Sequence, residues 1–379
     1  MNRANGEGRG VNLPALRGHN DALVLDLLRG AGASEGASEG AGAGARPGAA
    51  GPGLGRSELA ERTGLTPQAV SKITARLRAE GLVAEAGRGA STGGKPRTLL
   101  RLVPEARSAV GVHVDRDELR VVRVDLAGRV TADWRGPLDF GAGPGVVVDA
   151  VADAVVRTFA HPGSGAGPSQ VLGVGIAAPG PLDRRTGVLG RVTGFPEWEG
   201  FPLGEELAGR LGVAVVVDKD TNAGAGAGAG AGGDFGASVY LHVGTGLGAG
   251  LRLNGEVYRG ARSAAGEFGH QVLMLDGPPC RCGGRGCVEA LCLDAVARGD
   301  LAEAARVLGE AAANLVALLD VDRVVLGGRV VEGAPGVFVS GVSGALAARG
   351  AGATVALAGR GVAEGAAELI LAPFFGRSG

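Results

Sequence analysis

The sequence predicts an α/β protein with a small winged helix-turn-helix unit in front of a larger, two-lobed unit. Three observations support this. Residues 56–103 read as two short helices followed by two strands, strands and helices alternate from Ser108 onward, and the strand-turn-strand order of residues 109–125 recurs at 238–253. At 379 residues the chain is too long for one ordinary core, so two or three structural units are expected.

The composition argues against a membrane or secreted protein. Apolar residues make up 45% of the chain and charged residues 20%, and no apolar run approaches the roughly 18 residues that a membrane span needs. The first residues, MNRANGEGRG, carry no apolar segment behind their basic residues and do not read as a secretory signal. We therefore expect a cytoplasmic protein that makes no membrane contact.

The domain boundary is expected at residue 107, which separates residues 1–107 from residues 108–379. Within the first domain, residues 31–55 consist almost entirely of Gly, Ala, Ser and Pro and predict a flexible insert. Before this insert, one face of a predicted helix is formed by Leu16, Leu23, Val24, Leu27 and Leu28. A second low-complexity tract, residues 223–233, alternates Ala and Gly, and no function is assigned to it.

A helix-turn-helix is predicted after the insert. Ser57 is expected to cap a helix that ends near Thr63, Gly64 makes the turn, and Thr66 followed by Pro67 starts the second helix. Strands at 82–86 and 98–103 around a polar loop complete the pattern of a winged helix-turn-helix. The buried stripe of the second helix is expected to consist of Val70, Ile73 and Leu77.

This region has a basic charge that suits a polyanion. Residues 56–101 contain nine Arg or Lys against four Asp or Glu, although the whole chain has a net charge of only -1. We expect DNA binding, with Gln68, Ser71 and Lys72 entering a major groove. The side chains expected to neutralise phosphates are Arg76, Lys95 and Arg97. The alternative is a helical packing module with no role in DNA binding.

All four cysteines lie between positions 280 and 292, which points to metal or redox chemistry in a cytoplasmic chain. His270, Cys280, Cys282 and Cys287 form a complete tetrahedral zinc set. Because no coordination position stays open, the predicted zinc ion is structural. The alternative is a group of buried or redox-active thiols, and Cys292 is expected to be a small buried residue.

Two carboxylates, Glu267 and Glu289, flank the predicted zinc set in the sequence. They could accept hydrogen bonds from sugar hydroxyls in a cleft between the lobes. They could equally orient the imidazole of His270 on the metal. Both roles can hold together.

These motifs resemble the ROK family of repressors, open reading frames and sugar kinases. The motifs that carry the resemblance are the box 267–270, the zinc pattern His270/Cys280/Cys282/Cys287, and the segments 178–182, 217–222, 244–250 and 326–328. The resemblance implies an actin-like, ribonuclease H-like double lobe, and the N-terminal winged helix-turn-helix is typical of the regulator branch. It also implies that Asp220, Glu267, His270 and Glu289 contact a sugar, with the second ring nitrogen of His270 on zinc.

Two departures from the kinase members favour a regulator. Kinase relatives carry Asp-x-Gly-x-Thr in their first phosphate loop, but residues 115–119 lack its glycines, and the carboxylates of Asp117 and Glu118 would repel a triphosphate. Lys219 replaces the Asn that is usual before Asp220, which favours an anionic effector. In a kinase, Asp220 would be the general base that takes the proton from the sugar hydroxyl.

The expected function is therefore that of a non-enzymatic regulator of carbohydrate genes, acting as a repressor. It would bind a DNA operator as a homodimer or homotetramer and respond to a sugar or sugar phosphate. The alternatives are a sugar kinase with a fused DNA-binding domain, and a DNA-binding member that senses no ligand. The sequence names neither the sugar nor the operator.

Overall fold

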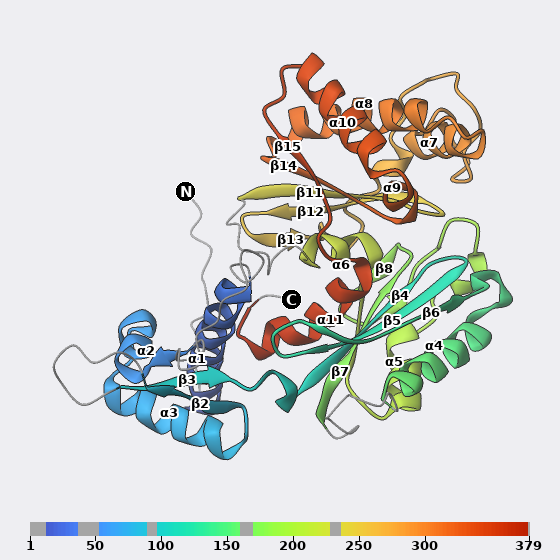
Figure 1. Cartoon of the computed structure of the whole chain (residues 1–379). Helices are drawn as coiled ribbons and strands as arrows, with labels where there is room; N and C mark the ends of the chain where they lie inside the picture. Colours follow the sequence, from blue (N-terminus) through green and yellow to red (C-terminus); the bar gives the residue numbers. More distant parts are fainter. Residues whose placement is uncertain (1–12, 37–52, 89–96, 160–169, 228–235, 378–379) are drawn as a thin grey trace, which may run out of the picture. The chain divides into compact units, whose positions relative to one another are not determined.

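The computed structural model describes residues 13–36, 53–88, 97–159, 170–227 and 236–377 (Figure 1). They fall into two compact units: the described residues up to Arg107 together with Ala372–Arg377, and Ser108–Leu371. None of the described helices is long and apolar enough to cross a membrane. The helices are α1 (Leu13–Gly36), α2 (Arg56–Thr63), α3 (Pro67–Ala79), α4 (Pro144–Phe159), α5 (Leu203–Leu211), α6 (Asp220–Ala227), α7 (Val288–Ala297), α8 (Leu301–Leu319), α9 (Arg329–Gly333), α10 (Pro335–Ala348) and α11 (Val362–Phe374).

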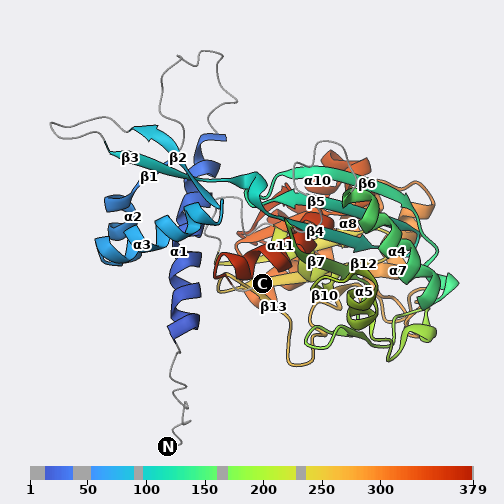
Figure 2. The same cartoon turned by 90° about the horizontal axis from the view of Figure 1, so that it is seen from below.

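The first unit is a winged helix-turn-helix, as predicted (Figures 1 and 2). Helices α1, α2 and α3 accompany a three-stranded antiparallel sheet of order β1-β3-β2, with β1 at Leu54–Gly55, β2 at Val83–Arg88 and β3 at Thr98–Leu102. Thr66 caps α3 by accepting a hydrogen bond from the Ala69 amide, and Pro67 occupies the first turn. Val70, Ile73 and Leu77 are buried, so the predicted apolar stripe of α3 is confirmed.

Two details of this unit differ from the prediction. Ser57 does not cap α2, because the helix already begins at Arg56 and its N-cap is Gly55, which has no side chain to offer. The insert expected at 31–55 is shorter, since α1 continues to Gly36 and Leu54 pairs with Leu100 in the sheet. Helix α1 continues although residues 29–36 contain three glycines, which disfavour helix, and the buried Leu54 gains a place in the core.

The second unit contains two lobes with the same sheet topology. The first-lobe sheet has the order β10-β7-β4-β5-β6 and the second-lobe sheet the order β13-β12-β11-β14-β15. In each lobe three strands form an antiparallel meander, and two further strands add in parallel beside the first strand of the meander. The predicted repeat of a strand-turn-strand unit is confirmed, and the repeat extends to all five strands of each lobe.

Several of the segments singled out in the sequence, such as residues 115–119 and Asp220, directly follow strands. The first-lobe strands are β4 (Ser108–Val114), β5 (Glu118–Asp125), β6 (Val130–Pro137), β7 (Val171–Ala178) and β10 (Val215–Lys219), with β8 (Leu182–Asp183) and β9 (Val188–Leu189) as a separate pair. The second-lobe strands are β11 (Ala237–Val243), β12 (Leu247–Leu253), β13 (Glu256–Tyr258), β14 (Arg323–Gly327) and β15 (Thr354–Leu357). Strand β10 ends at Lys219, so Asp220 is the first residue of α6.

Helices α6 and α11 pack together with both lobes through a shared apolar cluster that includes Ala177 of β7 and Tyr240 of β11. Glycines permit their close approach. A Cβ on Gly224 would lie 2.2 Å from a ring atom of Tyr240, and one on Gly365 would lie 1.9 Å from the Ala223 carbonyl oxygen. At least part of the Ala/Gly tract therefore has a packing reason.

Candidate functional site

The predicted zinc residues lie together beside α7. His270 ends a short 3-10 turn, Phe268–His270, and the thiols of Cys280, Cys282 and Cys287 lie in the loop that leads into α7. Each of the four offers a ligand atom within 4.8 Å of the others. Cys280 Sγ lies 3.7 Å from His270 Nδ1, and Cys282 Sγ lies 3.7 Å from Cys287 Sγ.

This donor set fits a tetrahedral zinc ion. Zinc–sulfur bonds of about 2.3 Å place neighbouring sulfurs about 3.8 Å apart. Burial raises the pKa of the Cys287 thiol to about 12, and a bound cation would oppose this shift by stabilising the thiolate. Cys292 lies apart on α7, is buried, and its thiol is 3.6 Å from the Ala304 carbonyl oxygen.

The four residues expected to contact a sugar line one pocket between the lobes: Asp220, Glu267, His270 and Glu289. Because Nδ1 of His270 faces Cys280, its Nε2 is the nitrogen available to the pocket. Glu289 is buried at the start of α7, and its Oε2 accepts a hydrogen bond from the Leu247 amide at 2.9 Å. Burial raises the pKa of Asp220 above its usual value, although the charge of Lys219 acts in the opposite direction.

Lys219 forms an ion pair that the sequence analysis did not foresee. Its Nζ lies 2.6 Å from Glu267 Oε1 and 3.3 Å from the Ala265 carbonyl oxygen. The lysine is only 5% exposed, whereas the side chain of Glu267 is 44% exposed. The charge of Lys219 is therefore already neutralised by one of the predicted sugar ligands, whereas Arg116 is a second basic residue that lines this pocket.

Asp218 anchors the segment that carries Lys219 and Asp220, and sequence reasoning assigned it no role. It is fully buried, and its Oδ2 accepts bonds from Arg184 at 3.2 Å and Arg259 at 2.8 Å. Its Oδ1 accepts a bond from the Asn222 amide nitrogen at 2.9 Å. A buried aspartate among arginines far away in sequence leaves no local pattern that could have identified it.

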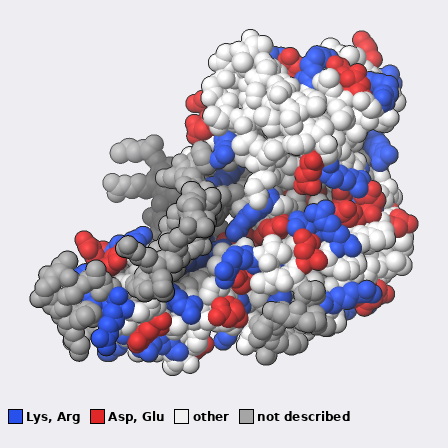
Figure 3. Space-filling model, viewed as in Figure 1, with Lys and Arg blue, Asp and Glu red and all other residues white. Residues whose placement is uncertain are grey.

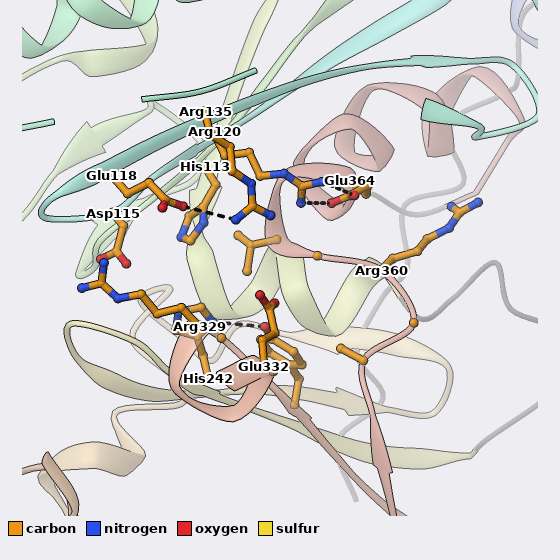
Figure 4. Close-up of a pocket in the computed structure, with 17 residues that line it drawn as sticks. His113, Asp115, Glu118, Arg120, Arg135, His242, Arg329, Glu332, Arg360 and Glu364 are labelled. Atoms are coloured by element: carbon orange, nitrogen blue, oxygen red, sulfur yellow. Dashed lines mark hydrogen bonds and ion pairs between the residues drawn. The ribbon is translucent and has the colours of Figure 1, made fainter. Parts of the chain in front are cut away.

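A second pocket between the lobes lies next to the first and shares Asp115 and His242 with it (Figure 4). Asp117, expected to repel a triphosphate, is paired with Arg329 at 2.7 Å. Glu118 lies 3.7 Å from Arg135. Burial, with a smaller effect of His242, lowers the pKa of His113 to about 3, so its imidazole is neutral near pH 7.

The predicted DNA-reading residues Gln68, Ser71 and Lys72 are exposed on α3. The Ser71 hydroxyl donates to the Pro67 carbonyl oxygen at 2.8 Å. On the face drawn in Figure 3, basic and acidic side chains are interspersed.

The three predicted phosphate contacts have different outcomes. Arg97 is exposed just before β3. Arg76 is half-buried and pairs with Asp21 of α1, so it stabilises the contact between α1 and α3 instead of pointing freely outward. Lys95 lies outside the described residues.

Comparison with known proteins gives this architecture a family. Residues 144–295 match the ROK family, and residues 50–84 match a winged helix-turn-helix DNA-binding domain. The solved structure of the ROK hexokinase from Thermus thermophilus is 30% identical in sequence, with a TM-score of 0.54. The match covers 69% of this chain and 96% of the hexokinase chain. The chain belongs to the ROK family.

Among other ROK proteins, the xylose repressor of Bacillus subtilis (strain 168) is 30% identical over 243 residues, which are 62% of this chain and 61% of that protein. The DNA-binding transcriptional dual regulator NagC of Escherichia coli (strain K12) is 30% identical over 252 residues, 64% of this chain and 59% of NagC. The chain thus aligns with about three fifths of these curated relatives. A ROK family transcriptional regulator described as a homolog of the E. coli MLC protein shares the fold, with a TM-score of 0.72 at 19% identity over 95% of this chain and 97% of that one.

Proposed function

We propose that this ROK protein is a cytoplasmic DNA-binding repressor of carbohydrate genes, controlled by a sugar in the cleft between its lobes. The carrying observation is that one chain joins a winged helix-turn-helix with exposed Gln68, Ser71 and Lys72 to a pocket lined by Asp220, Glu267, His270 and Glu289. The names of two relatives, a xylose repressor and the DNA-binding transcriptional dual regulator NagC, support a role in transcription, and the first supports repression.

The proposed effector is an uncharged sugar. Asp220, Glu267 and Glu289 offer carboxylate oxygens, which suit hydroxyl donors, and His270 adds a ring nitrogen. Lys219, the residue that favoured an anionic effector, is nearly buried and paired with Glu267. A phosphate group would therefore meet a neutralised Lys219 next to Asp220 and Glu289, with Arg116 as the other basic residue of the lining.

Zinc at His270, Cys280, Cys282 and Cys287 is proposed as a structural ion that holds His270 toward the pocket. The spacing of the four ligand atoms supports this assignment. We expect chelation, or Cys282→Ser, to lower the melting temperature and to weaken sugar binding in parallel. Cys292→Ser, outside the set, is the control for zinc content. Equal zinc content in the Cys282→Ser variant and the wild type would contradict the assignment.

A sugar kinase is the competing function, because Asp220 is retained at the position of the kinase base. The pairing of Asp117 with Arg329 neutralises one carboxylate that was expected to repel a triphosphate, so the case against a kinase rests on the missing glycines of residues 115–119 and on the other carboxylates that line this pocket. A coupled ADP-release assay across common hexoses separates the two functions. Turnover that disappears in Asp220→Asn would overturn the proposed function.

The regulator is proposed to act as a homodimer or homotetramer, because two half-sites are read by two recognition helices at a fixed spacing. The deciding experiment is a gel-shift titration of the full chain on the promoter region upstream of its own gene, with and without candidate sugars. We expect specific retardation that a sugar changes. Retardation absent under every condition would refute the DNA-binding role, and retardation that no sugar alters would refute sensing alone.

A further inference from the structure

Three potential metal ligands meet between the two pockets, away from the cysteine set. His113, Asp115 and His242 each offer a ligand atom, and these atoms lie within 4.8 Å of one another. Figure 4 shows the three labelled side chains at the same end of the pocket. Neither the ROK resemblance nor the predicted zinc set gives the two histidines a role.

The duplication of the lobes explains why the histidines meet. His113 is the sixth residue of β4, and His242 is the sixth residue of β11, the equivalent strand of the other lobe. Their rings stand edge to face with centroids 5.6 Å apart. Asp115 follows β4 directly, so the first lobe supplies two ligands and the second lobe one.

The surroundings orient all three groups for a cation. His113 Nε2 is buried and has no hydrogen-bond partner within the described part of the chain. His242 Nδ1 lies 3.1 Å from the Tyr240 hydroxyl, which fixes the ring and leaves Nε2 toward Asp115. Asp115 Oδ1 accepts bonds from the Arg116 amide and the Thr245 hydroxyl, which leaves Oδ2 for a metal. Such outer partners are typical of built metal sites.

The residue beside two of the three ligands is a glycine, Gly244. A Cβ on Gly244 would stand 2.9 Å from His242 Nε2 and 3.4 Å from Asp115 Oδ2, so glycine keeps a side chain out of this position. Ligand atoms on one zinc ion lie about 3.3 Å apart. An ion would therefore draw the three ligand atoms together by up to about an ångström and a half.

We propose that His113, Asp115 and His242 bind a divalent transition-metal ion, with zinc as the reference metal, that links the two lobes across the cleft. Two imidazoles and one carboxylate suit zinc or another first-row metal and leave a coordination position for water or a ligand oxygen. Because β4 and β11 belong to different lobes, metal binding favours the closed cleft.

Metal counting on the full chain tests this site separately from the cysteine set. The protein is stripped with EDTA, reloaded with zinc, desalted, and its zinc is measured by mass spectrometry. We expect two zinc ions per chain in the wild type and in the control His19→Asn, whose histidine is exposed on α1. We expect one in His113→Asn/His242→Asn and one in Cys280→Ser/Cys282→Ser. Equal zinc content in the wild type and the double-histidine variant would overturn the proposal.

Cobalt titration of the wild type keeps the test valid if a variant does not fold. Cobalt in the cysteine set gives thiolate charge-transfer absorption, whereas the histidine site should add only ligand-field bands with the second equivalent. Saturation at one equivalent would refute the second site. Tyr240→Phe should lower the affinity of that site about tenfold and leave the thiolate bands unchanged, because Tyr240 is a positioning residue. An unchanged affinity in Tyr240→Phe would contradict the orienting role of its hydroxyl.

Discussion

Lys219 and Glu267 neutralise each other at the edge of the proposed sugar pocket. With Oε1 at 2.6 Å from the ammonium group, Glu267 has Oε2 as its less occupied acceptor for a ligand hydroxyl. Asp220, one position further on, makes no such pair within the described part of the chain, and the cost of burying its carboxylate outweighs the opposing charges of His242 and Lys219.

A prediction for Asp220 follows from its raised pKa. The carboxyl group of Asp220 binds a proton more tightly in the folded protein than in the unfolded chain. The free energy of unfolding therefore rises as the pH falls from the pKa of Asp220 in the folded protein toward its pKa in the unfolded chain, about 3.9. We expect Asp220→Asn to melt at a higher temperature than the wild type at pH 7, with a difference that shrinks toward pH 4. Thermal unfolding across this pH range measures the effect.

The same variant should lose its thermal shift with sugar, because an amide cannot replace the charged acceptor. Asp153→Asn, exposed on α4, serves as the control and should change neither quantity. An Asp220→Asn protein that is less stable than the wild type at pH 7 would refute the interpretation.

At the scale of elements, α3 is the part of the chain that we expect to touch DNA. Lys72→Ala should weaken binding to every sequence and lower the slope of log affinity against log salt by about one. Arg306→Ala removes the same charge from the exposed surface of α8 and should leave the slope unchanged. Fluorescence anisotropy at several salt concentrations gives both slopes, and equal slopes for Lys72→Ala and the wild type would exclude this lysine from the interface.

Helix α6 packs closely against β11 because it carries a glycine at the point of contact. Because its Gly224 lies against the ring of Tyr240, Gly224→Val should force the helix away from β11 and destabilise the protein by about 1–3 kcal/mol. Gly209→Val on α5 is the matched control, since its Cβ would meet no atom within 4 Å. Urea unfolding compares the two. A smaller loss in Gly224→Val than in Gly209→Val would show that the close contact does not matter.

Across the whole molecule, local patterns predicted the helix-turn-helix, the cysteine set and the duplicated lobes. Each of these depends on residues that are near one another in sequence or on a repeated order of strands. The pairs Arg76–Asp21 and Lys219–Glu267, and the buried Asp218 with its arginines, join positions tens of residues apart. Their geometry is fixed only by the tertiary fold, so no spacing rule could have predicted them.

The packing of Ala372–Arg377 in the first unit was also not predicted. Phe375 is 2% exposed, and the centre of its ring lies 4.6 Å from the guanidinium carbon of Arg29 in α1. The guanidinium group of Arg377 lies 2.5 Å from the Asp26 carboxylate. We expect Phe375→Ala to cost about 3–5 kcal/mol and to speed hydrogen exchange in α1. Leu318→Ala, 74% exposed on α8, is the control. Unchanged exchange in α1 would contradict this assignment.

This arrangement has a consequence for synthesis of the chain. Residues up to 107 leave the ribosome first, but their folding unit gains Phe375 and Arg377 only after the entire ROK domain has been translated. A nascent or prematurely terminated polypeptide therefore carries an incomplete helix-turn-helix unit. The packing around α1 would then be completed only after the regulatory domain has been made.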